Sequence, residues 1–378
     1  MADNKDKKVL NVPHLRFPEF SGEWVETTLG KISEITKGSG ISKDQLSEQG
    51  SPCILYGELY TKYKSEIIDE VYSRTELDSS SLVKSKANDV IIPCSGETAI
   101  DISTARCVPF DNILLGGDLN IIRLKHDDGG FFAYQLNGAR KKDIARVAQG
   151  VSVVHLYGEN LKQIRVYHPN IEEQKKITRL LSLIDERIAT QNKIIEKLET
   201  LIKGIVETVI SSQKPNTLIK NCLECNSSTL QESQVAETGT FPVYGATDIS
   251  GYTETAGING ESILIIKDGS GVGTVKFVSG EYSYIGTLNS LTAKDGYCLK
   301  YIYFALQRFS FEPYKTGMAI PHIYFKDYGK AKIYCPSFSL QTLIAQKLSL
   351  IENKMEVEKR IILCYQLQRS YLLSRMFI

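Results

Sequence analysis

Apolar residues recur in alternating steps of four and three along two long stretches of the chain. On a helix this spacing builds one apolar stripe, and it is the seam pattern of a coiled coil. The first stretch keeps the pattern at Ile177, Leu181, Ile184, Ile188, Gln191, Ile195, Leu198, Ile202, Ile205 and Val209. The second keeps it at Ile344, Leu348, Ile351, Met355, Glu358, Ile362, Tyr365, Arg369, Leu372 and Met376. Two amphipathic helices on separate cores are the alternative, but so strict a period favours two helices that pack on each other.

The two stretches are copies of each other. HPNIEEQ at 168–174 returns as CPSFSLQ at 335–341, and LSLI at 181–184 returns at 348–351, in both cases 167 residues later. A proline just ahead of each stretch is tolerated where a helix begins. A repeat of this kind constrains the whole fold, because both copies are expected to adopt the same structure.

Each seam has one polar interruption near its midpoint, Gln191 in the first and Glu358 in the second. An antiparallel pair of helices would bring these two residues close together. We predict that they face each other and help to set the register.

Shorter apolar runs, separated by glycine and asparagine, lie outside the two helices. We expect strands at 89–93, 112–115, 262–266 and 274–278, and further helices at 131–145 and 299–309. Each long helix is therefore preceded by an α+β globule. The predicted domains are a globule at 1–168, a helix at 169–212, a globule at 213–335 and a helix at 336–378.

The order of these parts predicts how they are arranged. Because each helix starts where its own globule ends, the second helix must run back toward the first globule. The expected fold is α+β, with two globules separated by two long antiparallel coiled-coil helices and related by a pseudo-twofold internal repeat. The seam would be about 50 Å long. Two DNA half-sites one turn apart lie about 34 Å from centre to centre, so this scale suits two readers on one duplex.

Composition narrows the class of protein. The 378 residues, 24% charged and 42% hydrophobic, fit a folded protein of about two domains. The net charge of +1 argues against an indiscriminate binder of nucleic acid.

The N-terminus lacks the apolar core of a secretion signal and no run is long enough to span a membrane, so we expect a cytoplasmic protein. The eight cysteines are then expected to be free thiols. The single CxxC, Cys222–Cys225, is either a weak metal site or two small buried side chains.

Taken together, these motifs resemble the specificity subunit of type I restriction-modification systems. The resemblance lies in the lead-in VPHLRFPEFSGEWVETTLGKISEITKG, in RVYHPNIEEQ and KIYCPSFSLQ, and in the LSLID and LSLIE helices. It covers nearly the whole chain. One departure is Leu340 where the first copy has Glu173, which we expect to affect only a local cap.

The resemblance implies a division of labour. The globules would be target recognition domains, each reading one half of an asymmetric bipartite DNA site. The helices would fix the spacing between the half-sites and dock two modification subunits. Those partners would methylate adenine at N6 with S-adenosylmethionine, and restriction or motor subunits would use ATP and Mg²⁺. This chain would bind no cofactor.

We expect no catalytic residue and no metal site in the chain itself. It lacks the Asn/Asp-Pro-Pro-Tyr stretch of adenine methyltransferases and any G-x-x-x-x-G-K-[ST] loop. The glycine-rich stretch at 265–278 has the wrong spacing for a dinucleotide fingerprint and is followed by a predicted strand, which favours a hairpin turn. In the resembled family this region lies near DNA. Lys267, Ser270 and Lys276 are therefore candidate contacts with the DNA backbone.

A second repeated pattern is QGVSVVHLY at 149–157 and TGMAIPHIY at 316–324. Both copies keep the histidine and the tyrosine, so His155 and His322 are expected to make structural hydrogen bonds. The glycine-containing loops that precede them differ, and such loops can offer amides and hydroxyls to DNA. The candidate DNA contacts there are Gln149, Gly150, Ser152, Thr316, Gly317 and Met318.

Basic residues of the first globule are candidates for contacts with phosphate groups. They are Lys62, Lys64, Arg140, Lys141, Lys142 and Arg146. A run of charges is equally often just a solvated face, and that reading stays open.

Two other classes of function compete with DNA recognition. A coiled-coil adaptor with protein-binding ends would explain the helices but not two diverged globules, and an enzyme would need a catalytic constellation that the sequence lacks.

Overall fold

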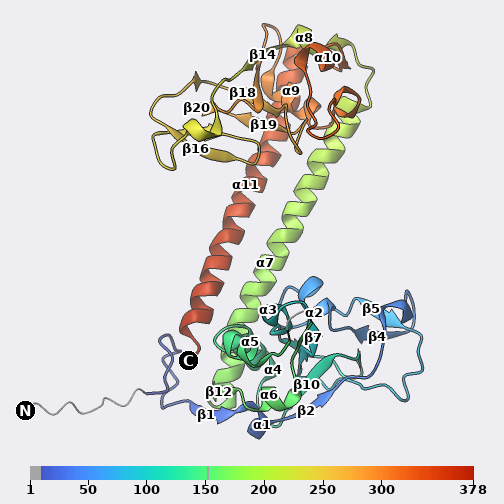
Figure 1. The fold of residues 1–378 in the computed structure, drawn as a ribbon, viewed down its shortest axis with the longest axis vertical. Helices are drawn as coiled ribbons and strands as arrows, with labels where there is room; N and C mark the ends of the chain where they lie inside the picture. Colours follow the sequence, from blue (N-terminus) through green and yellow to red (C-terminus); the bar gives the residue numbers. More distant parts are fainter. Residues whose placement is uncertain (1–9, 151–152) are drawn as a thin grey trace, which may run out of the picture. The chain divides into compact units, whose positions relative to one another are not determined.

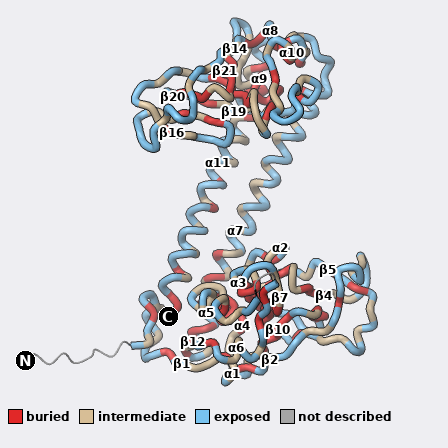
Figure 2. Tube along the Cα trace, viewed as in Figure 1, coloured by how far each residue is buried: buried red, intermediate tan, exposed pale blue. Residues whose placement is uncertain are grey.

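The computed structural model describes residues 10–150 and 153–378 (Figure 1). The chain forms two compact units. Unit 1 is Met1–Asn192 together with Ile361–Ile378, and unit 2 is Lys193–Arg360. Buried residues concentrate in the globular part of each unit, whereas the long helices are mostly exposed or half-buried (Figure 2).

Unit 1 is built on an antiparallel central sheet and a second, mixed sheet. Its central sheet has the strand order β2 (Ser33–Lys37), β10 (Leu119–Leu124), β6 (Asp89–Pro93) and β8 (Arg106–Val108). The second sheet has the order β3 (Leu46–Ser47), β5 (Ser73–Thr75), β4 (Ser51–Ile54) and β9 (Leu114–Leu115), and in it β4 and β9 pair in parallel. Two small pairs complete it, β1 (Val25–Thr28) with β12 (Arg165–His168) and β7 (Ser95–Gly96) with β11 (Val154–His155). The short helices of unit 1 are α1 (Leu29–Ile32), α2 (Glu58–Thr61), α3 (Ala99–Ile102), α4 (Gly129–Asn137), α5 (Lys141–Val147) and α6 (Gly158–Lys162).

Unit 2 repeats this plan. Its central sheet has the order β14 (Leu223–Ser227), β21 (Leu288–Ala293), β18 (Ser262–Ile266) and β19 (Val275–Val278). Its second sheet has the order β16 (Ile249–Thr253), β15 (Phe241–Tyr244), β20 (Glu281–Tyr284) and β17 (Ile258–Asn259), and the small pair is β13 (Thr217–Leu218) with β22 (Lys332–Ile333). The short helices of unit 2 are α8 (Ile219–Cys222), α9 (Leu299–Leu306) and α10 (Phe325–Tyr328). The strand order of the central sheet is thus the same in both units.

The apolar runs DVIIP and SILII form β6 and β18, as predicted, and every residue of both strands is buried. Successive side chains of a strand point to opposite faces, so each run feeds two cores. Val90 and Ile92 pack in the core with α4, whereas Ile91 packs in a second core with residues of the other sheet. β18 divides its side chains between two cores in the same way.

The predicted helix at 131–145 is wrong in one respect, because it is broken. α4 ends at Asn137 and α5 starts at Lys141. Gly138 caps α4 by donating its N–H to the carbonyl of Tyr134, and its backbone leaves the helical region. Glycine favours this end to a helix because it adopts such backbone angles at little cost.

The two long helices are α7 (Ile171–Val206) and α11 (Phe338–Arg375). In unit 1, the first half of α7 shares a core with the last part of α11, through Ile177, Leu181 and Leu372. In unit 2, the end of α7 shares a core with the start of α11, through Val206 and Leu348. The helices therefore pack together in opposite directions, which confirms the predicted fold class.

Most of the predicted seam is buried or half-buried in the structure. The fully buried positions include Leu181 and Leu348, and the half-buried ones include Gln191, Ile195, Leu198, Ile351 and Met355. Val209, the last expected position of the first seam, is instead 37% exposed, and Ile210 takes its place in the core. The reason is a π-helical turn, Glu207–Ser211, which adds one residue to the last turn after α7. Glu358 is buried and pairs with Lys354; its proximity to Gln191 stays a prediction.

Candidate nucleic-acid interface and its supporting frame

The repeated glutamine fastens each long helix to the short helix beneath it. Gln174 accepts a hydrogen bond from the N–H of Asp128, the residue that caps α4, at 2.9 Å. Gln341 accepts one from the N–H of Cys298, which caps α9, at 3.0 Å. Both side chains are buried, and each also donates to the carbonyl of the proline five residues earlier. The two copies therefore use the same device at the same place.

The residue before this glutamine differs between the copies. Glu173 is fully buried and forms a two-pronged ion pair with Arg16, with both N–O distances 2.7 Å. The indole N–H of Trp24 also donates to this carboxylate. Leu340, the equivalent residue of the second copy, is 41% exposed. The expectation that the change affects only a local cap is therefore wrong, since Glu173 ties the lead-in segment to α7.

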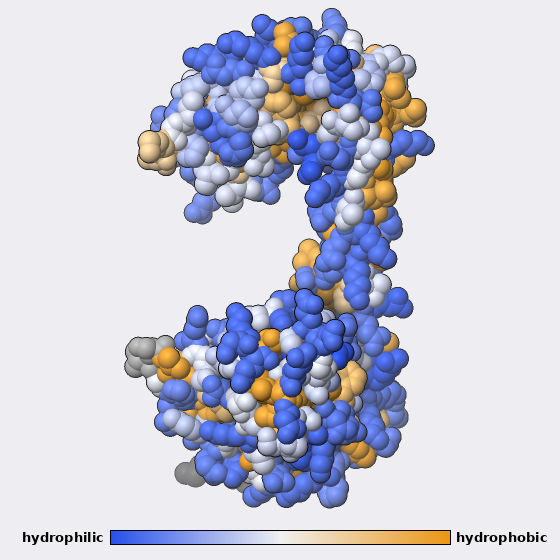
Figure 3. All heavy atoms as spheres, turned by 90° about the vertical axis from the view of Figure 1, so that its right-hand side faces the viewer, coloured by the Kyte–Doolittle hydropathy of each residue, from blue (hydrophilic) through white to orange (hydrophobic). Residues whose placement is uncertain are grey.

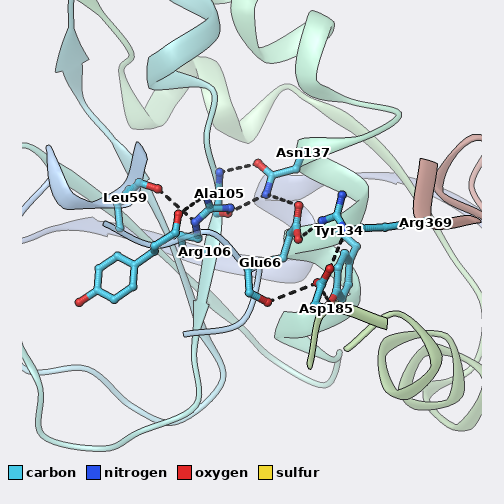
Figure 4. A network of polar contacts seen from close by, with 10 residues as sticks. Leu59, Glu66, Ala105, Arg106, Tyr134, Asn137, Asp185 and Arg369 are labelled. Atoms are coloured by element: carbon cyan, nitrogen blue, oxygen red, sulfur yellow. Dashed lines mark hydrogen bonds and ion pairs between the residues drawn. The ribbon is translucent and has the colours of Figure 1, made fainter. Parts of the chain in front are cut away.

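A buried polar network joins α11 to the globule of unit 1 (Figure 4). Arg369 donates to Asp185 of α7 at 2.6 Å and also pairs with Glu66. The hydroxyl of Tyr134 in α4 donates to the same Asp185 carboxylate at 2.7 Å. Although burial opposes the charge of Arg369, the carboxylates of Glu66 and Asp185 raise its pKa above the ordinary value. The polar seam position at 369 is thus a cross-link between two helices and the globule.

In unit 2 the carboxylate equivalent to that of Asp185 belongs to Glu352, and it has a different partner. Glu352, 167 residues after Asp185, pairs with Lys300 of α9 at 2.7 Å. The ammonium of Lys300 also lies 4.1 Å from the ring centre of Phe277 and 4.6 Å from that of Tyr303. At the position equivalent to Arg369, α7 has Ile202, which packs against the core. Each unit therefore fixes its own part of the frame with different partners.

The described residues of the two sequence copies at 149–157 and 316–324 make matching hairpin contacts. Gln149 and His155 exchange backbone hydrogen bonds at 2.9 and 2.7 Å, and Thr316 and His322 do so at 2.9 and 2.8 Å. The second residue of each loop is a glycine with positive φ, +122° at Gly150 and +87° at Gly317. A Cβ there would lie 2.1 Å and 2.4 Å from a carbonyl oxygen across the loop, so both turns require glycine.

The histidines close these hairpins through their backbone groups. Their rings lie beside the tyrosines two residues later, with centres 6.2 Å apart for His155 and Tyr157 and 5.2 Å apart for His322 and Tyr324. The Nδ1 atom of His322 is also 3.2 Å from the carbonyl oxygen of Ile320. For His155 the described contacts are its backbone bonds and the ring of Tyr157, so the structural role of both histidine side chains stays a prediction.

In unit 2 the hairpin rests on the glycine-rich loop after β18. Gly269 donates to the carbonyl of Pro321, and Ile323 donates to the carbonyl of Lys267, both at 2.9 Å. The structure thus brings Lys267 and Ser270 to the same loop cluster as Thr316, Gly317 and Met318. Lys276 differs from these candidates, because it pairs with Asp248 and lies 4.7 Å from the ring centre of Tyr244.

The basic candidates of unit 1 fall into two groups. Lys62 pairs with the buried Glu58 at 2.6 Å, and Arg140 bonds to Asp143 and to the carbonyl of Ile378 while its side chain is 15% exposed. Burial, aided by the cation of Arg106, lowers the pKa of Lys141. These three side chains are engaged by the fold. Lys62 is nevertheless 45% exposed. The other exposed candidates are Lys64, Lys142 and Arg146, of which Arg146 is paired with Asp143 but 75% exposed.

Sequence reasoning missed one part of the loop cluster in unit 1. β7, Ser95–Gly96, pairs with β11 beside the Gln149 hairpin, at the place where the glycine-rich loop lies in unit 2. A glycine-containing turn after each buried strand, CSGE and KDGSG, was the available signal. Ser152, another candidate, lies outside the described residues.

All eight cysteines are free thiols, and five of them are buried. Cys222 is buried, and its Sγ lies 3.2 Å from the carbonyl oxygen of Ile219. The neighbouring Cys335 thiol and burial both raise the pKa of Cys222, and burial raises that of Cys225 to about 11.

Within residues 10–150 and 153–378, no group of three His, Cys, Asp or Glu side chains could hold a metal ion. None of the helices in this described part combines the length and apolarity that a membrane crossing needs.

Two solved structures share this fold over nearly their full length. The S subunit of a type I restriction-modification system from M. genitalium is 19% identical with a TM-score of 0.73, and the match covers 97% of this chain and 99% of that one. A structure titled for complex assembly and conformational transition of the type I R-M system is 14% identical, with a TM-score of 0.52 and coverages of 94% and 97%. The family model described as the type I restriction modification DNA specificity domain matches residues 21–200 and 221–363, which is most of the chain. The chain therefore belongs to the family of type I restriction-modification specificity subunits.

Proposed function

We propose that this chain reads an asymmetric bipartite DNA site, one half with each unit, and docks modification subunits that methylate adenine. The supporting observation is that Gln149 and His155, like Thr316 and His322, close a loop with the same two backbone hydrogen bonds, while the sequences between them differ. Two readers of unlike half-sites need a common scaffold and different contact residues. Residues 1–168 and 213–335 would be the reading domains, and residues 169–212 and 336–378 the helical frame.

Within this proposal the hairpins and the loops beside them contact DNA. Gln149, Gly150, Ser152, Thr316, Gly317 and Met318 would contact base edges or the groove wall, while Lys267 and Ser270 would bind the backbone. Amides and hydroxyls on such loops suit both kinds of contact. Among the basic candidates, we favour Lys64, Lys142 and Arg146 for phosphate contacts because they are exposed. Lys62, Arg140, Lys141 and Lys276 are weaker candidates, since protein partners or burial engage each of them.

The outer face of α11 supports docking of a partner subunit. Leu343, Leu350 and Val357 are spaced seven residues apart and are 50%, 64% and 49% exposed. Orange, apolar patches are visible along the long helices in Figure 3. A stripe of apolar residues at a heptad spacing is what a further helix would pack against. The chemistry of methylation, with S-adenosylmethionine, would belong to that partner.

The test is to co-express the chain with a modification subunit and to map methylated adenines in the host genome. A bipartite motif with two adenines about one turn apart is expected, together with a specific gel shift by the purified complex. Leu350→Asp should break the complex, whereas Arg360→Asp, on a polar exposed position of the same helix, should leave it intact. A stable complex that neither methylates nor binds any specific duplex would favour the coiled-coil adaptor instead.

A further inference from the structure

The hairpin Thr316–His322 carries two apolar side chains that project into solvent. Met318 is 106% exposed, and Ile320 is 66% exposed. Among the large apolar side chains of residues 10–150 and 153–378, none is as exposed as these two. Neither side chain buries apolar surface in the fold, and two such side chains on one short hairpin form an apolar tip that is free to contact another molecule.

The hairpin holds these side chains on a rigid base. Two backbone hydrogen bonds between Thr316 and His322 close it, and the glycine-rich loop supports it through Gly269 and Pro321. Gly317 is confined by the carbonyl of Ile320, because even a Cβ would lie 2.4 Å from that oxygen. Little backbone entropy would be lost when such a tip inserts into a partner.

Comparison of the two hairpins shows which kind of partner suits the tip. At the base of the loop, Val153 and Ile320 are both exposed aliphatic residues, at 52% and 66%. In the sequence, Met318 and Ala319 stand where the first copy has Val151 and Ser152, which lie outside the described residues. A protein that docked on both units in the same way would require the same tip twice. A tip that differs between the units fits a partner whose two halves differ, which in this chain is the bipartite duplex.

We infer that Met318 inserts as a wedge between two base pairs of the half-site bound by unit 2, with Ile320 against the adjacent sugar edge. This inference rests on the proposed function. Apolar side chains inserted at a base step from the minor groove unstack the step and kink the duplex. The exposed Ser270, on the glycine-rich loop that supports the hairpin, offers a hydroxyl to the sugar-phosphate backbone. Pyrimidine–purine steps deform most easily, so the wedge would favour such a step without a hydrogen bond to any base.

The test uses the purified complex of this chain with its modification subunit and duplexes that carry the motif found by methylation mapping. 2-Aminopurine replaces one base at a time across the half-site, with the target adenine left in place. Binding should raise 2-aminopurine fluorescence at one step, independently of S-adenosylmethionine. Met318→Ala should abolish that rise and weaken binding roughly tenfold, equivalent to about 1.4 kcal/mol.

Two further variants separate a wedge from a general surface effect. Met318→Leu keeps an apolar side chain of similar reach and should restore the fluorescence rise. Ile249→Ala shortens another exposed aliphatic side chain of unit 2, 45% exposed, and should change neither readout. If the wild-type complex binds its motif but no position brightens, or if Met318→Ala retains the signal, the wedge is wrong while the proposed function stands. If the wild-type complex binds no motif, the proposed function itself fails.

Discussion

At the start of α7 the carboxylate of Glu173 is buried against Arg16, whereas at the start of α11 the equivalent Leu340 is exposed to solvent. The glutamines that follow these residues make the same hydrogen bonds in both units. Asp185 and Glu352 show the same contrast, because one pairs with Arg369 of α11 and the other with Lys300 of α9. The copies thus keep the joint between a helix and its own globule, and they differ where unit 1 must also hold the lead-in segment and the end of α11.

The largest effect is expected from Arg369→Leu, because it would leave Asp185 and Glu66 buried without their cation. Such a loss should destabilise unit 1 by about 3 to 5 kcal/mol. Urea unfolding can be followed through Trp24, the only tryptophan, which lies in the core of unit 1. The control Arg375→Leu removes an exposed arginine of the same helix. Equal costs for the two variants would contradict the cross-link.

Glu173→Gln should cost about 3 kcal/mol in the same assay, since it leaves Arg16 largely buried without a counter-charge. The matched change in unit 2, Leu340→Gln, alters an exposed side chain and should cost less than about 0.5 kcal/mol by circular dichroism. A comparable loss at both positions would remove the contrast between the two junctions.

The glutamine fastening makes the opposite prediction, namely equal effects in both units. Gln174→Leu and Gln341→Leu each leave a partly buried N–H, of Asp128 or Cys298, without its acceptor. Each change should cost about 1 to 3 kcal/mol. Hydrogen exchange at the starts of α4 and α9 would measure it. Faster exchange in only one unit would show that the two glutamines do not stabilise their short helices equally.

The smallest effect is expected at the exposed cations of unit 1. Arg146→Ala should weaken DNA binding alike for all sequences and lower the salt slope by about one. Arg140→Ala should act on stability instead, because Arg140 bonds to the last residue, Ile378. An unchanged salt slope for Arg146→Ala would remove this residue from the DNA contacts.

Local patterns in the sequence predicted the parts of the structure that depend on local spacing. The seam and the buried strands β6 and β18 follow from periodicity, and the correspondence of the loops at 149–157 and 316–324 follows from the repeat at 167 residues. Partners far apart in the chain were not predictable in this way. Nothing near Glu173 indicates Arg16, which is 157 residues earlier, and nothing near Arg140 indicates Ile378. Both arginines look like surface charges until the fold supplies their acceptors.

The π-helical turn Glu207–Ser211 also bears on how such a helix can change its length. One extra residue in a regular α-helix rotates every later side chain by about 100°. Here the additional residue is absorbed within a single turn, so that Ile210 reaches the core where Val209 would otherwise lie. The end of α7 is therefore a point at which the phase of the helix is reset. An insertion of one residue there leaves the contacts of the preceding seam in place.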